Sequence, residues 1–300
     1  MSENIEYKGR FAPSPTGPLH FGSLVAAVGS YLQARHSEGK WLVRIDDIDP
    51  PREKKGAADH ILTTLEQFGF EWDEKVYYQS ERQAYYQDVV DELIRQQLAY
   101  PCSCSRSSIL KKTGQHKGEI IYPGFCRNGP LDKSSDYNIR LRTDGALIQF
   151  NDRLMGEHDV NLENSQGDFI LQRRDHFFSY HLASGIDDAE QGITEVVRGS
   201  DLLNCTPSQL YVQQVLNLRS PQYCHLPIAV NPDGQKLSKQ NHALPIEPQD
   251  AVNLLVKSLK FLGQMPSNEL IKSNKKDVWN WAMNHWQLDL VPLKSQQVIF

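Results

Sequence analysis

Apolar and polar positions alternate along the chain in a way that predicts strands and helices in turn. Apolar runs at residues 5–11 and 41–45 have the length of buried strands, and helical spacing over residues 23–34 separates them. Two strands joined through one helix normally form a right-handed crossover, in which the strands lie parallel in one sheet. The pattern therefore predicts an α/β fold with a Rossmann-like parallel sheet.

Further patterns continue this order toward the C-terminus. Helical spacing recurs over residues 56–68, 81–98, 206–216, 248–263 and 275–287, and strand-like runs over residues 169–174, 193–198 and 225–230. The first of these runs is expected to return to the sheet. Alternation within residues 137–150 predicts a β-hairpin, whereas the polar residues 151–168 are expected to be irregular. Trp279 and Trp286 on the last helix are better explained by core packing than by stacking on RNA bases.

The connection between the first predicted strand and helix carries the first candidate chemistry. Residues 10–23 read Arg-Phe-Ala-Pro-Ser-Pro-Thr-Gly-Pro-Leu-His-Phe-Gly-Ser, a turn too rich in proline for helix. His20 and Gly22 come where the helix begins, and the unpaired N–H groups of a helix N-terminus suit a phosphate. His20 can donate to the same oxygens, and Gly22 lets a base or ribose approach the backbone. On its own, the motif is more typical of an ordinary strand–turn–helix connection.

A second motif, Lys236-Leu-Ser-Lys239-Gln, comes after the predicted strand at residues 225–230. Two lysines on one loop can clamp a triphosphate and follow its charge as a bond breaks, although a lone Lys-x-x-Lys pair is usually solvated surface. Together and in this order, the two motifs resemble the paired signatures of class I aminoacyl-tRNA synthetases. The stretches Leu42-Val-Arg-Ile-Asp-Asp-Ile-Asp, Val197-Arg-Gly-Ser-Asp-Leu-Leu and His225-Leu-Pro resemble the glutamyl branch in particular. The resemblance covers about residues 7–245.

This resemblance implies a glutamate site. Arginine binds a carboxylate through a bidentate fork, so Arg10 and Arg198 are the expected receptors for the acidic groups. Asp46 would hold the ammonium; it stands where the family usually has glutamate, and its carboxylate reaches one methylene less far. The implied glutamate-binding set is Arg10, Phe11, Ala12, Pro13, Ser14, Asp46, Tyr180 and Arg198.

The same resemblance implies that ATP, bound with Mg²⁺, converts glutamate into glutamyl-adenylate. Phosphoryl chemistry of this kind depends on positioning and charge stabilisation and needs no covalent enzyme nucleophile. The implied catalytic residues are His20, Lys236 and Lys239, and the implied ATP-binding residues are His20, Gly22, Ser23 and Lys239.

Three of the five cysteines form a possible metal site. Cys102, Cys104 and Cys126 lie close in sequence, and three thiolates can hold zinc when a fourth ligand closes the tetrahedron. Chemistry alone suggests His116 as that ligand. A short, glutamyl-synthetase-like group of tRNA-modifying enzymes, which this spacing resembles, uses Cys, Cys, Tyr and Cys, and the resemblance therefore favours Tyr122. Such a site would be structural, and the alternative is a reduced cluster without metal.

Composition limits the other classes of function. Cys205 and Cys224 stand alone and are expected to be small buried residues rather than part of a disulfide framework. No apolar run approaches the about 20 residues that span a bilayer, and the N-terminal residues do not resemble a signal peptide. We therefore expect a cytoplasmic protein without membrane contact.

The net charge of the chain does not indicate a nucleic-acid partner. The chain has 32 basic against 37 acidic side chains, a net charge of −5, whereas RNA-binding domains usually leave a basic footprint. RNA phosphates would have to meet local patches, and solvated surface is the alternative for each. The two candidate patches are Arg106, Lys111, Lys112, Lys117 and Arg127 in the cysteine-containing region, and Arg52, Lys54 and Lys55 near the first motif.

The acceptor of glutamate is inferred from the short stretch of chain beyond the matching region. Full glutamyl-tRNA synthetases continue much further to bind the anticodon, whereas only residues 246–300 remain here. With the cysteine spacing, this resembles the short tRNA-modifying group, in which glutamate goes to queuosine at the wobble position of tRNA(Asp). The expected partners are glutamate, ATP and the queuosine-containing anticodon stem-loop, bound by a monomer. The alternatives are a minimal glutamyl-tRNA synthetase that charges the 3′ end, another nucleotidyltransferase and a non-enzymatic tRNA-binding relic.

The resemblance also implies a division of the chain into four parts. Residues 1–100 are expected to form the first half of a Rossmann-like catalytic domain of class I synthetase type, and residues 101–168 a zinc-binding, mixed α/β insertion. Residues 169–245 would complete the catalytic domain, and residues 246–300 would form a short helical C-terminal region.

Overall fold

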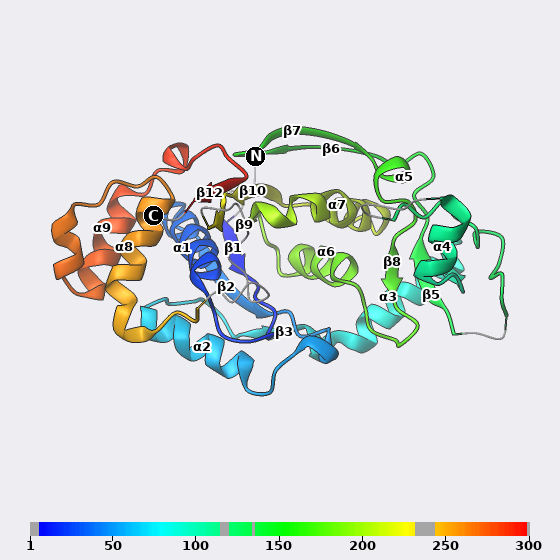
Figure 1. The fold of residues 1–300 in the computed structure, drawn as a ribbon, viewed down its shortest axis with the longest axis horizontal. Helices are drawn as coiled ribbons and strands as arrows, with labels where there is room; N and C mark the ends of the chain where they lie inside the picture. The colour runs from blue at the N-terminus through cyan, green and yellow to red at the C-terminus, as the bar shows by residue number, and fades with distance from the viewer. Residues whose placement is uncertain (1–5, 115–119, 134–135, 232–243, 299–300) are drawn as a thin grey trace.

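Parallel strands form the centre of the structure, a computed structural model that describes residues 6–114, 120–133, 136–231 and 244–298. Strands β1 (Lys8–Phe11), β2 (Lys40–Ile45) and β3 (Tyr77–Tyr78) lie in that order in one parallel sheet. Helix α1 (Phe21–His36) connects β1 to β2, as Figure 1 shows. The predicted α/β fold with a parallel sheet is therefore confirmed.

The other elements are distributed along the whole chain. The remaining strands are β4 (Ala99–Cys102), β5 (Asn138–Leu141), β6 (Leu147–Asp152), β7 (Gly156–Asn161), β8 (Ile170–Gln172), β9 (Glu195–Gly199), β10 (Gln222–Leu226), β11 (Ile228–Val230) and β12 (Gln296–Val298). The remaining helices are α2 (Ala57–Phe68), α3 (Gln83–Arg95), α4 (Arg106–Thr113), α5 (Leu162–Ser165), α6 (Tyr180–Glu190), α7 (Thr206–Val215), α8 (Ala251–Phe261) and α9 (Lys275–His285). Within the described ranges, none of these helices has the length and apolar character that a membrane span requires.

Strands from the second half of the chain lie beside the first sheet. β9 and β10 pair in parallel, and β10 also meets β6. The N–H of Thr194, just before β9, donates to the carbonyl of Lys8 in β1 over 2.9 Å, which joins the two groups of strands. β11 pairs in parallel with β12. The single strand predicted over residues 225–230 is thus two strands, interrupted at Pro227.

The predicted hairpin within residues 137–150 is wrong. β5 pairs with β4 and β8 in an antiparallel sheet, whereas β6 pairs with β7, inside the region expected to be irregular. The β6–β7 turn is closed by Asp152, whose Oδ1 accepts from the N–H groups of Leu154 (3.1 Å) and Met155 (2.9 Å). Alternation assigns each residue to a face of a strand, but it does not choose the neighbouring strand.

The small antiparallel sheet lies at one end of the elongated molecule, next to α4 (Figure 1). Its third strand, β8, was expected to return to the parallel sheet and does not. Two separate segments of the chain therefore lie at this end of the molecule. The first comprises β4, α4 and β5, and the second is β8, which comes before α6. The pairing of β8 with β5 places the cysteine-containing region next to the elements that follow β8.

Helices α8 and α9 lie at the opposite end and pack on α1 and on each other (Figure 1). The Trp279 ring lies 5.0 Å from that of Tyr31 and 4.9 Å from that of Phe70, and its Nε1–H donates to the carbonyl of Phe68 (3.0 Å). Trp286 donates to the Gln33 side chain over 2.9 Å. Both tryptophans are buried, so the expectation that they belong to the core is confirmed.

Candidate active site and cysteine cluster

A cavity of about 850 Å³ opens where β1, β2, β9 and β10 end. The carboxyl ends of parallel strands are the usual place for ligands in such sheets. Among the described residues of the predicted glutamate and ATP sites, all line this cavity: Arg10, Phe11, Ala12, Pro13, Ser14, His20, Gly22, Ser23, Asp46, Tyr180 and Arg198. The structure thus brings together residues that are up to 188 positions apart in the sequence (198 − 10 = 188).

Lys236 and Lys239 lie outside the described residues. The described chain on either side of them adjoins the cavity. Ile228 and Ala229 of β11 line it, and Pro245 forms a β-bridge with His20. The N–H of Ile246 donates to the carbonyl of Leu19 over 3.0 Å.

The proline-rich turn after β1 is fixed by the loop after β2. The carbonyl of Pro13 accepts from the N–H of Asp46 (3.1 Å), and the carbonyl of Pro15 accepts from the N–H of Lys54 (3.0 Å). Proline restricts the turn itself, and these two hydrogen bonds hold it against the second strand. The turn therefore leads into α1 at a defined angle.

His20 is the N-cap of α1, with extended backbone angles (φ −122°, ψ 174°). Its Nδ1 accepts from the N–H of Ser23 over 3.3 Å. A neutral ring that accepts at Nδ1 carries its proton on Nε2, which is then a donor. The first-turn N–H groups and the partial positive charge of the helix end add to that donor. This end of α1 can bind an anion.

Arg198 is a buried cation whose described hydrogen-bond acceptors are all neutral. Its guanidinium donates to neutral acceptors: Tyr180 Oη (3.1 Å), Gln209 Oε1 (2.8 Å), Thr206 Oγ1 (2.8 Å), Leu202 O (3.3 Å) and His225 Nε2 (3.0 Å). Within the described part of the chain no carboxylate lies within 4.0 Å of it. The side chain is 4% exposed, so it is held rigidly, and none of its described hydrogen-bond partners carries a charge. Such a group selects an anionic ligand.

A histidine and an aspartate behind Arg198 fix its orientation. His225 Nδ1 donates to Asp152 Oδ2 (2.6 Å), which leaves Nε2 to accept from Arg198. Burial and the charge of Arg198 lower the pKa of His225 to about 4. The ring is therefore neutral at pH 7, as an acceptor from arginine must be. Sequence reasoning quoted His225 only as part of the family resemblance and missed Asp152.

Arg10 differs from Arg198 because it already has an acidic partner. Its Nε and Nη2 donate to the two oxygens of Asp188, at 3.0 and 3.1 Å. Arg44 donates to the same Asp188 (2.7 Å) and to Asp46 (2.7 Å). These four buried charges sum to zero, so the cluster is stable in the free protein and can accept a ligand that carries both charges.

The pKa values of the two acids in this cluster differ. Although burial opposes ionisation, Arg10 and Arg44 lower the pKa of Asp188 to about 2. Burial raises the pKa of Asp46, against the influence of Arg44. The sequence analysis missed both Asp188 and the role of Arg44. The acidic doublet Asp187-Asp188, which follows the largely apolar first two turns of α6, was the available signal.

The three clustered cysteines come together in the structure. The Sγ atoms of Cys102, Cys104 and Cys126 all lie within 4.8 Å of one another, and all three residues are buried. Cys104 Sγ and Cys126 Sγ are 3.7 Å apart. Zinc–sulfur bonds of about 2.3 Å at tetrahedral angles require sulfurs about 3.8 Å apart. The donor set and spacing therefore fit zinc.

Tyr122 supplies a fourth polar atom at the cluster. Its hydroxyl lies 3.2 Å from Cys102 Sγ and 3.6 Å from Cys104 Sγ. The guanidinium of Arg140 covers the Tyr122 ring, 4.0 Å from its centroid, and donates to Cys102 Sγ (3.3 Å). His116 lies outside the described residues. Of the two isolated cysteines, Cys224 is buried as expected, whereas Cys205 is half-buried.

The cysteine cluster is tied to β8 by a close backbone approach and an ion pair. Gly167 has φ +66°, and a Cβ there would lie 2.2 Å from the carbonyl oxygen of Tyr122, so only glycine fits. Next to it, the buried Asp168 accepts a two-pronged ion pair from Arg127, with both distances 2.7 Å. Arg127 was expected in a surface patch for RNA. It is instead bound within the protein.

The other members of the two basic patches remain at the surface. Arg106, Lys111 and Lys112 on α4 are exposed, whereas Lys117 lies outside the described residues. Arg52 is 72% exposed, pairs with Asp49 over 2.5 Å, and lines the mouth of the cavity. The surface position of these residues is compatible with phosphate contact and with simple solvation.

Comparisons with protein-family models and with curated proteins indicate the same family. The model of the catalytic domain of class I tRNA synthetases for glutamate and glutamine matches residues 6–260. A curated protein of Dechloromonas aromatica, named glutamyl-Q tRNA(Asp) synthetase, is 50% identical over 294 residues, which cover 97% of this chain and 98% of that protein. The protein of the same name from Photobacterium profundum is 47% identical over 300 residues, covering 100% of this chain and 94% of that protein.

The fold is similar to solved synthetases. A glutamate tRNA ligase from Elizabethkingia meningosepticum, solved in complex with its amino acid, superposes with a TM-score of 0.79 at 25% sequence identity. The match covers 98% of this chain and 67% of that one. A glutamate-tRNA synthetase from Elizabethkingia anophelis superposes with a TM-score of 0.78, at 25% identity, and covers 96% of this chain and 67% of that one.

Proposed function

Because this chain belongs to the class I tRNA synthetases of the glutamate and glutamine branch, we propose that it activates glutamate with ATP and transfers the glutamyl group to queuosine in tRNA(Asp). The chain is a ligase of this family. Its relatives at about half identity over nearly their whole length carry the name glutamyl-Q tRNA(Asp) synthetase, and that name supports queuosine as the acceptor.

Arg198 is the observation that carries the glutamate part of the proposal. A buried guanidinium whose described partners are all neutral needs an anion, and it lies at the end of β9 in the cavity. A side-chain carboxylate of glutamate would supply that anion, and since the five N–H donors of Arg198 already have acceptors, the carboxylate would replace some of these neutral groups. Tyr180, already hydrogen-bonded to Arg198 over 3.1 Å, would donate to the same carboxylate.

The ammonium end of glutamate would face Asp46, which lines the cavity, while Asp188 lies behind it and binds Arg10 and Arg44. Arg10 and Arg44 flank both carboxyl groups, hold them in place and favour their ionised forms. Arg10 would have two roles. It binds Asp188, and it lines the cavity, where it would lie near the α-carboxylate of the substrate. Asp188, which the sequence analysis did not include, fixes Arg10 and Arg44 beside Asp46.

Activation would result from bringing the two substrates together. An oxygen of the α-carboxylate attacks the α-phosphorus of ATP, the bond to the bridging oxygen breaks, and pyrophosphate leaves. His20 Nε2–H and the first-turn amides of α1 would donate to phosphate oxygens. Lys236 and Lys239 would bind the departing pyrophosphate, on the evidence of the sequence motif alone. Magnesium, when bound with ATP, neutralises part of the phosphate charge.

Transfer would use the adenylate as the activated ester. A hydroxyl of the queuosine cyclopentene-diol attacks the glutamyl carbonyl carbon, the bond to the phosphate oxygen breaks, and AMP leaves with that oxygen. The hydroxyl proton passes to solvent or to the leaving phosphate. Because AMP is a good leaving group, the protein has chiefly to position the acceptor and exclude competing water.

The cysteine cluster would hold a structural zinc ion through Cys102, Cys104, Cys126 and Tyr122. The zinc would join β4 to the segment before β5 and stabilise the antiparallel sheet. All four positions would be occupied by protein atoms, so the site has no part in the chemistry.

The decisive test uses synthetic anticodon stem-loops that end in a 2′,3′-dideoxynucleotide. Such an RNA has no terminal hydroxyl to be charged, and the vicinal diol of queuosine is the acceptor offered for glutamate. We expect labelled glutamate to be transferred to the queuosine stem-loop and not to the same RNA with guanosine at that position. Periodate cleavage of the queuosine diol should abolish transfer.

The opposite pattern identifies the alternative. Labelling of full-length tRNA at its 3′ end, independent of queuosine and absent from the blocked stem-loop, would contradict the proposal and indicate a minimal glutamyl-tRNA synthetase. Glutamate-dependent pyrophosphate exchange, measured without RNA, reports the activation step separately.

A further inference from the structure

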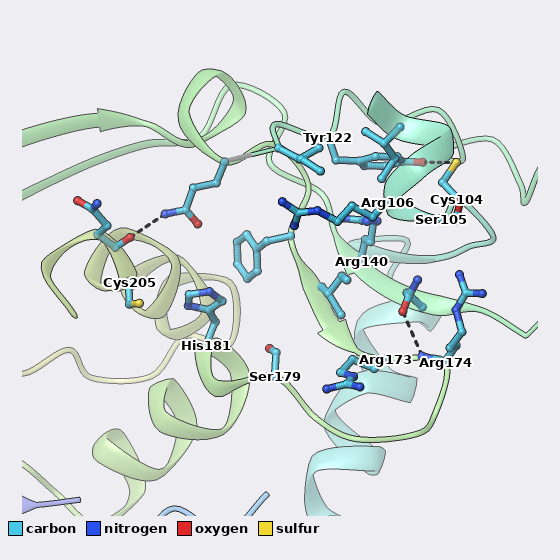
Figure 2. A pocket seen from close by; sticks show the side chains of 17 residues that line it. Cys104, Ser105, Arg106, Tyr122, Arg140, Arg173, Arg174, Ser179, His181 and Cys205 are labelled. Carbon is cyan, nitrogen blue, oxygen red and sulfur yellow. Dashed lines mark hydrogen bonds between the residues drawn. The ribbon is translucent and has the colours of Figure 1, made fainter. Parts of the chain in front are cut away.

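A second cavity, of about 780 Å³, lies beside the first one and is shown in Figure 2. Its walls come from α4, β5, β8, the first turn of α6 and residues 204–205. Four arginines line it: Arg106, Arg140, Arg173 and Arg174. No Asp or Glu occurs among the described residues of its lining. In a chain of net charge −5, this is a concentrated positive surface inside a hollow.

The four arginines differ in the partners that they have within the protein. Arg140 is used within the protein, where it donates to the carbonyl of Asp168 (2.7 Å) and covers Tyr122. Arg173 pairs with Asp175 over 2.5 Å at the rim. Arg106 and Arg174 are exposed, and within the described ranges neither has an ion-pair partner. These two guanidinium groups are therefore available for a phosphate.

One wall of the cavity is aromatic and neutral. The rings of Phe169 and His181 meet edge to face, with centroids 5.6 Å apart. His181 Nδ1 is buried and has no hydrogen-bond partner among the described residues. Burial, together with the charge of Arg198, lowers the pKa of His181 to about 4, so the ring is neutral. A neutral ring nitrogen beside an aromatic face suits the edge of a nucleobase rather than a phosphate.

The two cavities share their dividing wall. On the first turn of α6, Tyr180 lines the catalytic cavity, whereas Ser179 and His181 line the second. The rings of Tyr180 and His181 have centroids only 6.2 Å apart. The segment after β9 divides in the same way, with Leu202 on the catalytic side and Cys205 on the other. A ligand in the second cavity is therefore separated from the proposed glutamate site by the first turn of α6.

We propose that the second cavity binds a nucleotide of the anticodon loop adjacent to the queuosine, with phosphates of the loop bound by Arg106 and Arg174 and the base of that nucleotide against Phe169 and His181. This inference rests on the proposed function, because it takes an RNA loop as the ligand. It goes further by assigning a site that holds the neighbouring nucleotide while the queuosine diol reaches over the α6 turn. Fixing the neighbour in this way orients the acceptor at low entropic cost.

The phosphate part is tested with the double variant Arg106→Ala/Arg174→Ala and the matched control Arg219→Ala. Arg219 is also an exposed arginine, and it lines neither cavity. Binding of a fluorescent queuosine stem-loop is measured by anisotropy at several salt concentrations. Each lost contact to a single-stranded phosphate lowers the slope of log K against log salt by about 0.7. We expect the double variant to lower it by about 1.4 and the control to leave it unchanged. Thermal unfolding reports whether each variant folds.

The base part is tested with stem-loops that have an abasic residue on the 5′ or the 3′ side of queuosine. Stacking on an aromatic side chain strengthens binding by about 5- to 160-fold per base. We expect one of the two abasic RNAs to bind the wild-type protein more weakly by such a factor. The same RNA should lose less with Phe169→Leu or His181→Ala, since the side chain and the base act as a pair.

The proposal is overturned if both abasic RNAs bind the wild-type protein as tightly as the intact loop. It is equally overturned if the double arginine variant has the salt slope of Arg219→Ala. A failure of the proposed function looks different. In that case the wild-type protein transfers no glutamate to queuosine, while loop binding still depends on Arg106, Arg174 and one neighbouring base, and the second cavity stands as an RNA site.

Discussion

The two cavities on either side of the first turn of α6 differ in the arginines that would bind their ligands. In the catalytic cavity, Arg10 and Arg198 are 3% and 4% exposed and have several hydrogen bonds each. In the second, Arg106 and Arg174 are exposed and have no ion-pair partner within the described residues. Buried, fixed guanidinium groups orient a small molecule, whereas exposed ones attract a polymer through its charge. The two cavities should therefore respond differently to mutation, loss of metal, pH and salt.

The largest difference is expected from Arg198→Lys. Lysine keeps the charge but loses the fork and the hydrogen bonds to Gln209 and Thr206. Removing one member of a buried, hydrogen-bonded charge pair costs about 2–5 kcal/mol, so kcat/KM for glutamate in pyrophosphate exchange should fall on the order of 10³-fold. Binding of the RNA loop should be unchanged. Equal losses in both assays would contradict the division between the cavities.

Loss of the proposed zinc ion should affect the two cavities in the opposite order. We expect Cys126→Ser to lose the metal and to lower the unfolding midpoint by roughly 10 °C, which corresponds to about 3 kcal/mol. Loop binding should weaken more than pyrophosphate exchange, because the cluster supports the sheet beside the second cavity. Cys205→Ser should retain one zinc per chain, measured by a metal indicator after denaturation.

The fourth zinc ligand can be assigned in the same measurement. Tyr122→Phe keeps the ring beneath Arg140 and removes only the hydroxyl. If Tyr122 is the ligand, this variant binds zinc more weakly and His116→Ala does not. The reverse result would assign His116.

A smaller effect should appear in the pH dependence of stability. The pKa of His225 is about 4 in the folded protein against 6.5 ordinarily, so between these values the unfolded chain binds a proton that the folded chain does not. The unfolding free energy should therefore fall as pH drops from 6.5 to 4, by up to about 3 kcal/mol. The lowered pKa of Asp152 acts in the same direction only below 3.8.

Comparing His225→Gln with His181→Gln in urea unfolding at pH 6.5 and 4.5 measures the share of each ring in this effect. Both variants should flatten the pH dependence. We expect changes of similar size from the two variants, because the pKa of each ring is lowered to about 4 in the folded protein. An unchanged slope in both variants would mean that other groups cause the acid sensitivity.

The smallest effect is expected from Arg52→Ala, at the mouth of the catalytic cavity. Its pair with Asp49 is exposed, so the unfolding free energy should change by less than about 1 kcal/mol. If Arg52 contacts a phosphate of the loop, the salt slope of RNA binding should fall by about 0.7. No change in slope would limit the RNA footprint to the second cavity.

The sequence predicted local structure and the strand ends better than pairings over long distances. The turn that leads to His20 and the strand that leads to Asp46 could be predicted because proline, glycine and apolar runs act on their immediate neighbours. The ion pair of Arg10 with Asp188 joins residues 178 positions apart, and no local pattern indicates it. For the same reason Arg127 was assigned to a surface patch, whereas Asp168, 41 residues away, binds it.

The error at residues 137–168 has a related cause. Alternation in β5 and β6 was correctly taken as strand, but the partner of each strand depends on turns. The β6–β7 turn is made by a side-chain cap from Asp152, which composition alone does not distinguish from an ordinary acidic loop. The second cavity could not be predicted either, because Arg106 begins α4 and Arg174 follows β8, two segments that are far apart in the sequence.

The pairing of β11 with β12 has a consequence for how the protein is made. β11 ends at Val230, just before the lysine motif, yet its neighbour β12 begins only at Gln296. During translation the edge of β11 is therefore left uncovered until β12 has emerged, a situation that favours pairing with other chains. The activating half of the enzyme reaches its final form late in synthesis, so the nascent chain has a window in which it is most vulnerable to aggregation.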